Sequence, residues 1–149
     1  MVPFKFRVWD TIRKEMMYQP LADLEDLYIG VIDGEIYENF RGDDDSLRPT
    51  HGRYELSQFT GLLDCDGKQI YDGDVCTYHY TDRHEIEFNG SAIIYWDKIN
   101  CGFSLTIIKD SRDDTRSQMS LFSVSTGRLR LNIIGNKFES PELLEVKND

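Results

Sequence analysis

Short segments in which apolar and polar residues alternate run through the whole chain, and glycine-containing turn signals separate them. At the start, Phe4, Phe6 and Val8 share one side of an extended segment. This period of two predicts strands with one buried and one solvated face. Between residues 75 and 134 turn signals recur about every 8–12 residues, a spacing typical of a small antiparallel barrel or a strongly bent sheet. The strand–helix alternation of a parallel α/β sheet is missing from the sequence.

The N-terminal third adds other elements to this pattern. A short helix of about two turns is expected to begin at Pro20 and to end near Tyr28, because Pro suits the first helical position and acidic residues follow it. Residues 28–32 and 35–40 are expected to form a hairpin around Asp33-Gly34. Residues 41–53 are polar and predict a long surface loop.

Further hairpins are expected in the C-terminal part. Asn89-Gly90 is the strongest short hairpin signal, and it predicts that 84–88 and 91–96 are paired strands. Thr126-Gly127 predicts another hairpin between 119–124 and 129–133. The expected fold class is therefore mainly β (a β-rich α+β protein), with an SH3-like or barrel-like antiparallel sheet and a short N-terminal helix. We expect one domain over residues 1–149, with a strand, helix and hairpin part at about 1–53 and a barrel-like part at about 54–149.

The net charge argues against a general nucleic-acid binder, and the length of the apolar runs argues against a membrane-spanning segment. The chain has 17 Lys and Arg against 27 Asp and Glu, a net charge of −10. This argues against a general nucleic-acid binder, which draws its affinity from clustered basic residues. Arg128 and Arg130, on one side of an expected strand, are the local exception. The longest apolar run, residues 92–96, is far shorter than the roughly 20 residues of a membrane span. The start of the chain lacks the apolar region of a signal peptide, so the expected location is the cytoplasm.

Several clusters of acidic, His or Cys residues are candidates for a metal site. Asp64, Asp66, Asp72 and Asp74 crowd together, but placing Gly67 at the glycine of a calcium loop puts apolar or glycine residues at both end positions. His79 and His84, five residues apart, lack the further ligands that zinc needs. The acidic run at 43–45 is expected to be solvated. Cys65, Cys76 and Cys101 are widely spaced and are expected to be reduced thiols. We expect no metal and no cofactor.

Three parts of the chain together resemble a known family. They are residues 6–10 with 16–18, residues 58–75, and residues 134–136 with 141–145. In this order they resemble the YopX family of phage and mobile-element proteins. Cys65 stands where such proteins carry a polar residue, and Asp72 where Glu is common. The resemblance implies a mainly β protein with a barrel-like part, without an established activity and without a catalytic residue to transfer.

The central segment carries the candidate site residues. Glycines recur every six residues in it, beside Asp or Thr, which predicts tight turns around a short strand at 68–71. The alternative is a binding surface that includes Tyr71, Asp72 and Asp74. The full candidate set is Gly61, Asp64, Gly67, Tyr71, Asp72, Gly73 and Asp74.

The leading hypothesis is a non-catalytic prophage or mobile-element β-barrel protein that acts by interaction or assembly. Its expected partner is another copy of itself, or a host or phage protein. Strand edges and exposed aromatic residues support this hypothesis. Two alternatives stay open: a metal-dependent or hydrolytic enzyme that uses the Asp cluster, and a nucleic-acid-associated small barrel.

Overall fold

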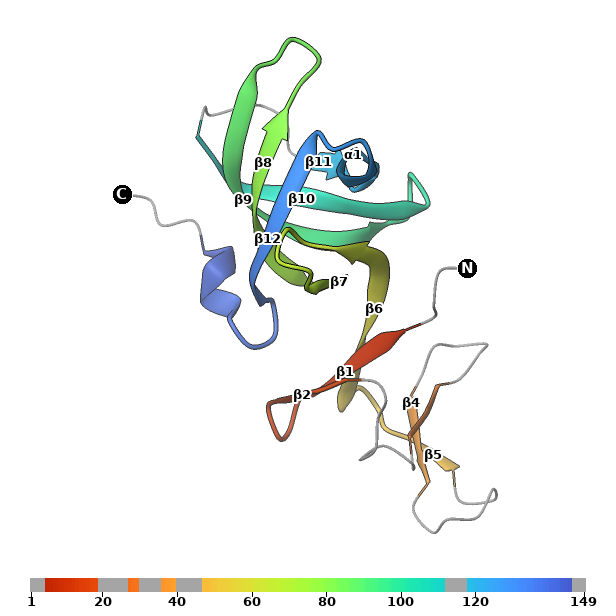
Figure 1. Ribbon diagram of the computed structural model, residues 1–149. Helices are drawn as coiled ribbons and strands as arrows, with labels where there is room; N and C mark the ends of the chain where they lie inside the picture. The colour runs from red at the N-terminus through yellow and green to blue at the C-terminus, as the bar shows by residue number, and fades with distance from the viewer. Residues whose placement is uncertain (1–4, 19–26, 30–35, 40–46, 112–117, 146–149) are drawn as a thin grey trace. The chain divides into compact units, whose positions relative to one another are not determined.

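The computed structural model describes residues 5–18, 27–29, 36–39, 47–111 and 118–145, and the chain divides into two compact units. The N-terminal unit comprises Lys5–Ser57, and the C-terminal unit takes in Gln58–Asp149. The strand β6 (Tyr54–Leu63) contributes residues to both. Each unit is built from antiparallel strands (Figure 1).

The N-terminal unit contains two sets of paired strands. In the first, β1 (Phe6–Asp10) pairs with β2 (Glu15–Tyr18), and β1 also lies next to β6 in the sheet order. The second is the three-stranded sheet β3 (Leu27–Ile29), β4 (Ile36–Asn39) and β5 (Leu47–Pro49). Val8 and Ile36 are buried together, and Met17, Tyr54 and Leu56 pack against them. β1 therefore contributes Val8 to the core of this unit. The predicted solvated face of this strand is wrong, because Arg7, Trp9 and Asp10 are buried as well.

Polar groups fix the N-terminal unit as well. Asp10 is buried, and its carboxylate accepts the Ile12 and Arg13 backbone N–H groups and a hydrogen bond from the Arg53 guanidinium at 3.0 Å. Burial raises the pKa of Asp10, but the bonds from Arg53 and from the two backbone groups outweigh burial, so the pKa lies below its ordinary value. Asp10 therefore ties the β1–β2 turn to the residue that precedes β6.

The N-terminal predictions have different outcomes. The hairpin is confirmed as the antiparallel pair β3–β4, although its Asp33-Gly34 turn lies outside the described residues. The prediction of one long surface loop at 41–53 is wrong, because β5 lies within this segment and pairs with β4. Most of the expected helix from Pro20 lies outside the described residues, but Leu27 and Tyr28, at its expected end, belong to a strand.

The C-terminal unit is built around a curled five-stranded antiparallel sheet with the order β11-β10-β9-β8-β12 (Figure 1). Its strands are β8 (Asp74–Thr81), β9 (Glu87–Asp97), β10 (Gly102–Asp110), β11 (Gln118–Ser120) and β12 (Leu129–Asn136). The concave side carries a core that includes Tyr78, Ile94, Leu105 and Leu131. The short strand β7 (Gln69–Tyr71) pairs with β6, and its Ile70 joins that core. The barrel-like, mainly β fold predicted from the sequence is confirmed.

The predicted hairpin around Thr126-Gly127 is wrong. β11 pairs with β10 and β12 pairs with β8, so the two strands lie at opposite ends of the sheet order. The helix α1 (Phe122–Ser125) connects them, and Gly127 follows it with φ +73°. Two strands separated by a turn signal can each find a different partner when the sheet curls far enough to bring its ends near one another.

The predicted Asn89-Gly90 hairpin is also wrong, because both residues lie inside β9. The turn falls earlier, at residues 82–86, where the Asp82 carboxylate accepts the His84 and Ile86 backbone N–H groups. Gly90 pairs with Tyr78 of β8 on one side and with Asp110 of β10 on the other. A Cβ at this position would lie 1.9 Å from the Lys109 carbonyl oxygen. The glycine is thus required for close strand approach and not for a turn.

At the C-terminal end, the 3₁₀ helix η2 (Pro141–Leu144) follows β12. A Cβ at Gly135 would lie 2.7 Å from Leu143 Cδ1, so the Leu143 side chain would have to shift. Within the described part of the chain, neither α1 nor η2 has the length and apolar character needed to cross a bilayer.

Candidate functional site

The glycines of the central segment adopt a backbone conformation that other residues rarely adopt. Gly61, Gly67 and Gly73 have φ values of +86°, +81° and +85°. Gly67 and Gly73 lie in the turns that flank β7, as expected, whereas Gly61 lies within β6, where the pairing with β7 shifts register. The six-residue spacing therefore marks two turns and one strand irregularity.

Asp64 joins the first of these turns to β12. Its Oδ1 accepts the backbone N–H groups of Asp66 and Lys68 at 2.9 and 2.8 Å, and its Oδ2 accepts that of Ile133 at 3.0 Å. Burial raises the pKa of Asp64, but these three bonds together outweigh burial and hold the pKa below its ordinary value. The neighbouring Cys65 N–H donates to the Leu131 carbonyl at 2.9 Å. The turn thus covers part of the free edge of β12 with hydrogen bonds.

The other aspartates of the cluster form hydrogen bonds with different partners. The buried Asp74 accepts the Tyr71 N–H at 2.8 Å, and Asp66 accepts a hydrogen bond from the Asn132 amide at 3.1 Å. Asp72 donates its own backbone N–H to the Gln58 carbonyl. Tyr71 and Asp74 are both buried, with exposed fractions of 2% and 1%, so neither presents its side chain to solvent. Across the described residues, no three His, Cys, Asp or Glu side chains converge as metal ligands would.

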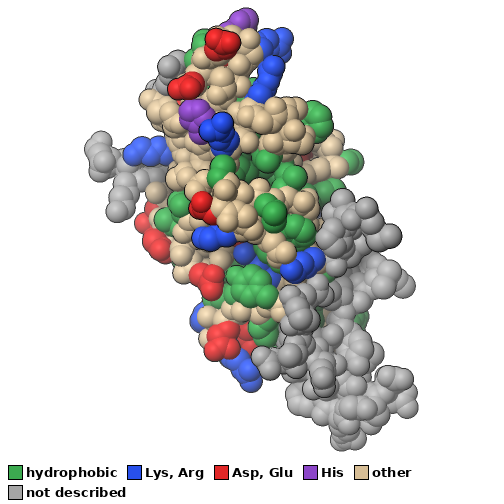
Figure 2. All heavy atoms as spheres, viewed as in Figure 1, with side chains coloured by type: hydrophobic (Ala, Val, Ile, Leu, Met, Phe, Trp, Pro, Cys, Tyr) green, Lys and Arg blue, Asp and Glu red, His purple; other side chains and the backbone are tan. Residues whose placement is uncertain are grey.

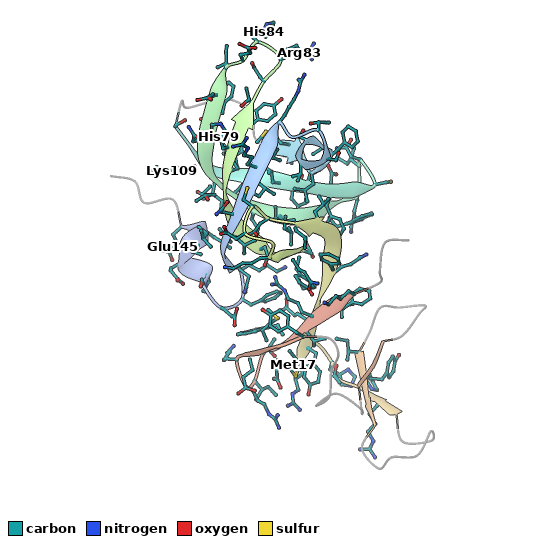
Figure 3. The ribbon with its side chains drawn as sticks, viewed as in Figure 1. Met17, His79, Arg83, His84, Lys109 and Glu145 are labelled. Atoms are coloured by element: carbon teal, nitrogen blue, oxygen red, sulfur yellow. The ribbon has the colours of Figure 1, made fainter. Side chains whose placement is uncertain are left out.

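The two histidines of the expected pair lie apart. His79 lies on β8, whereas His84 lies beside Arg83 in the β8–β9 turn (Figure 3). His79 Nδ1 lies 2.6 Å from Asn89 Oδ1, and its Nε2 lies 3.7 Å from a Glu87 carboxylate oxygen. The structure therefore gives His79 neighbours from β9 in place of His84.

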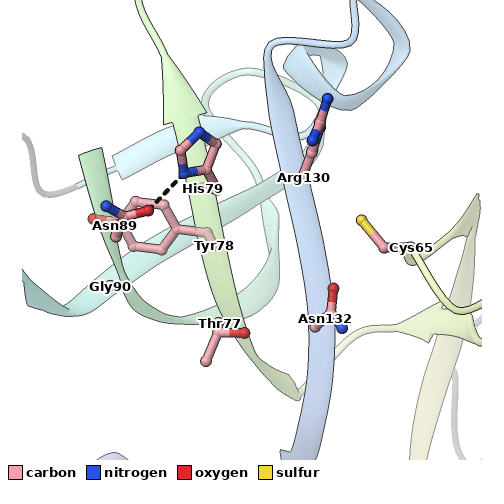
Figure 4. Close-up of a pocket in the computed structure, with 8 residues that line it drawn as sticks. All are labelled: Cys65, Thr77, Tyr78, His79, Asn89, Gly90, Arg130 and Asn132. Atoms are coloured by element: carbon pink, nitrogen blue, oxygen red, sulfur yellow. Dashed lines mark hydrogen bonds between the residues drawn. The ribbon is translucent and has the colours of Figure 1, made fainter. Parts of the chain in front are cut away.

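A depression of about 610 Å³, lined mostly by polar residues and named here the polar depression, lies along β8, β9 and β12. Its lining includes Arg130, His79 and Asn89, and Figure 4 shows the hydrogen-bonded His79 and Asn89 to one side of β12 and Cys65 to the other. The full lining is Cys65, Thr77, Tyr78, His79, Asn89, Gly90, Arg130 and Asn132.

The strand register explains why these side chains meet. Arg130 pairs with His79, and His79 pairs with Asn89, which places all three in one row across the sheet. Asn132 and Thr77 form the next row on the same face. Neighbouring strands lie about 4.8 Å apart and successive rows about 7 Å apart. Alternation in the sequence identifies the solvated face of each strand, but it cannot identify the partner strands, so this grouping was not predicted.

A second surface, the aromatic end, consists of Trp96, Ile99, Phe103 and Phe122. Trp96 and Phe103 pair across β9 and β10, and their rings meet edge to face with centroids 5.1 Å apart. The Leu121 N–H donates to the Phe103 carbonyl, which brings the start of α1 to this end of the sheet. Exposed fractions are 47% for Trp96, 92% for Ile99 and 74% for Phe122. Hydrophobic side chains reach the surface around α1 and the β9–β10 turn in Figure 2.

The three cysteines differ in environment. Cys76 is fully buried and donates its thiol to the Ala92 carbonyl, with sulfur and oxygen 3.6 Å apart. Burial, with a smaller contribution from the Asp74 charge, raises the pKa of Cys76 to about 12. Cys65 and Cys101 are exposed, and all three thiols are free.

Comparison with known proteins finds a family model and solved structures that match the chain. A family model described as YopX protein matches residues 5–145. Among solved structures, the chain is similar to the crystal structure of protein EF1440 from Enterococcus faecalis, with 25% identity and a TM-score of 0.54. That match covers 97% of this chain and 100% of the other. A search of curated proteins gives no match.

Proposed function

The chain belongs to the YopX family, and from this premise we propose that it is a non-catalytic interaction protein of a prophage or mobile element that assembles with copies of itself. The observation that carries the proposal is the aromatic end. Trp96, Ile99 and Phe122 are all exposed there. Grouped exposed apolar side chains mark interaction sites, and aromatic residues dominate the energetics of protein interfaces.

A second copy fits this surface for a structural reason. β11 is the terminal strand of the five-stranded sheet, so its outer backbone groups face away from β10. Such an edge is a template for another strand. β11 leads directly into α1, so strand edge and aromatic end adjoin. Antiparallel pairing of two β11 strands would place the same surface on both copies, as a two-fold dimer requires.

The test is the mass in solution. Light scattering at micromolar protein is expected to give at least twice the monomer mass of 17.4 kDa. Phe122→Asp and Ile99→Asp are expected to yield a folded monomer, because both side chains are exposed. Ile12→Asp in the N-terminal unit is the matched control, since Ile12 is 70% exposed, and it should leave the assembly intact.

Two results would contradict the proposal. One is a monomeric wild-type protein. The other is an assembly that survives both aspartates at the aromatic end. Leu105→Asp serves as a reference for unfolding, because Leu105 is fully buried in the core of the sheet. Circular dichroism of each variant separates dissociation from unfolding.

A further inference from the structure

We propose that the polar depression binds the phosphoryl group of a small ligand such as a nucleoside monophosphate, with Arg130 as its principal contact. This site is independent of self-assembly. The proposal rests on the kinds of side chain in the depression, on their arrangement in the strand register and on the local charge.

The lining is rich in hydrogen-bond donors. Arg130, Thr77 and Asn89 carry side-chain N–H or O–H groups that can donate to an oxyanion. Asn132 has a second amide hydrogen besides the one that it donates to Asp66, whereas the Nδ1–H of His79 is engaged by Asn89 Oδ1. These lining residues occupy neighbouring positions in two rows of the sheet. A guanidinium binds phosphate oxygens in a two-pronged geometry. A phosphoryl group has three terminal oxygens, so it can engage more of these donors than the two oxygens of a carboxylate can.

The local charge is opposite to that of the chain. The chain has a net charge of −10, yet none of the residues that line the depression is Asp or Glu. Arg130 is exposed and has no ion pair among the described residues. An exposed guanidinium without an ion-pair partner, in a lining that contains no Asp or Glu, attracts a compact anion.

The margins of the depression favour a small ligand over a polymer. Glu87 lies beside His79 at one margin, and Asp66 holds the Asn132 amide at another. A continuous polyanion that crossed the depression would meet these carboxylates. A single phosphoryl group is small enough to bind without meeting them. The flanking carboxylates could then accept hydrogen bonds from the hydroxyl groups of an attached sugar.

The experiment is an amide and arginine Nε–H nuclear magnetic resonance titration of the full chain with inorganic phosphate and with adenosine monophosphate. Matched sodium chloride serves as the reference for ionic strength. We expect saturable shifts at residues 77, 79 and 130 with a Kd of about 1 mM or tighter. Arg130→Gln is expected to weaken binding at least about tenfold, which is the scale of a lost charge-assisted contact.

Arg83→Gln is the matched control, because it removes the same charge from the exposed β8–β9 turn (Figure 3). It should leave the Kd within about twofold of the wild-type value. The proposal is overturned if phosphate causes no more shift than chloride, or if Arg130→Gln titrates like the wild type. An oligothymidylate that binds more tightly than adenosine monophosphate would overturn the assignment to a small ligand.

Discussion

Replacing Gly90 by alanine tests the packing at the centre of the curled sheet. Gly90 lies in one row between Tyr78 and Asp110. The Tyr78 hydroxyl donates to the Asp110 carboxylate, so the ring reaches across the glycine from β8 to β10. An added methyl group would lie 1.9 Å from the Lys109 carbonyl oxygen and 2.9 Å from Tyr78 Cε1.

The cost follows from these distances. Ordinary contact begins at 3.4 Å, so β10 must retreat by 3.4 − 1.9 = 1.5 Å, and the Tyr78 ring must also move. Overpacking of this kind costs about 1–3 kcal/mol. Loss of the hydrogen bond between Tyr78 and a carboxylate adds about 1.5 kcal/mol or more. We therefore expect Gly90→Ala to lower the free energy of unfolding by about 3 kcal/mol and Tm by about 10 °C.

Urea denaturation followed by tryptophan fluorescence measures the effect. Gly102→Ala is the matched control, because the nearest atom to its added methyl group would lie at an ordinary 3.8 Å. That variant should differ from the wild type by less than about 0.5 kcal/mol. If Gly90→Ala unfolds at the wild-type urea midpoint, the close strand approach inferred here is refuted.

Three further predictions concern the central segment and the thiols. Gly73→Ala should cost about 1–2 kcal/mol in thermal unfolding, because φ is +85° and the added Cβ would lie 3.0 Å from the Lys137 side chain; a stability equal to the wild type would contradict this. Asp64→Asn should cost about 1–2 kcal/mol at neutral pH. The pKa of Asp64 is lowered on folding, so its contribution is present above the ordinary value of 3.8 and is lost as pH falls below it. The difference between wild type and variant should therefore shrink in acid, and a difference independent of pH would argue against the charge. A thiol reagent should label two cysteines in the native protein and the third, Cys76, only in denaturant; rapid native labelling of all three would show that Cys76 is accessible.

The turns beside Asp residues could be predicted from the sequence because their cause is local. Asp64 and Asp74 bond to backbone groups within four residues, and Gly67 and Gly73 supply the positive φ that these turns need. Such interactions do not depend on which strands pair. The turns in the family motif could therefore be predicted from the sequence alone.

Pairing between distant strands could not be predicted in the same way. The sequence Asn89-Gly90 is compatible both with a turn and with a strand that another backbone approaches closely, and only the neighbouring β10 decides between them. The polar depression depends on the same long-range information. Arg130 meets His79 only because β12 crosses to the far end of the sheet order.

The hydrogen bonds from the Asp64 turn to β12 have a consequence for folding. The bond from Ile133 to Asp64 joins residues 69 positions apart. Contacts of such long sequence separation form slowly, since the intervening chain must first be ordered. During synthesis from the N-terminus, more than half of the chain that follows the Asp64 turn must therefore be made before β12, its partner strand, is available. Until then the edge of β8 that will receive β12 is open, and this interval is when the nascent chain is most exposed to pairing with the wrong strand.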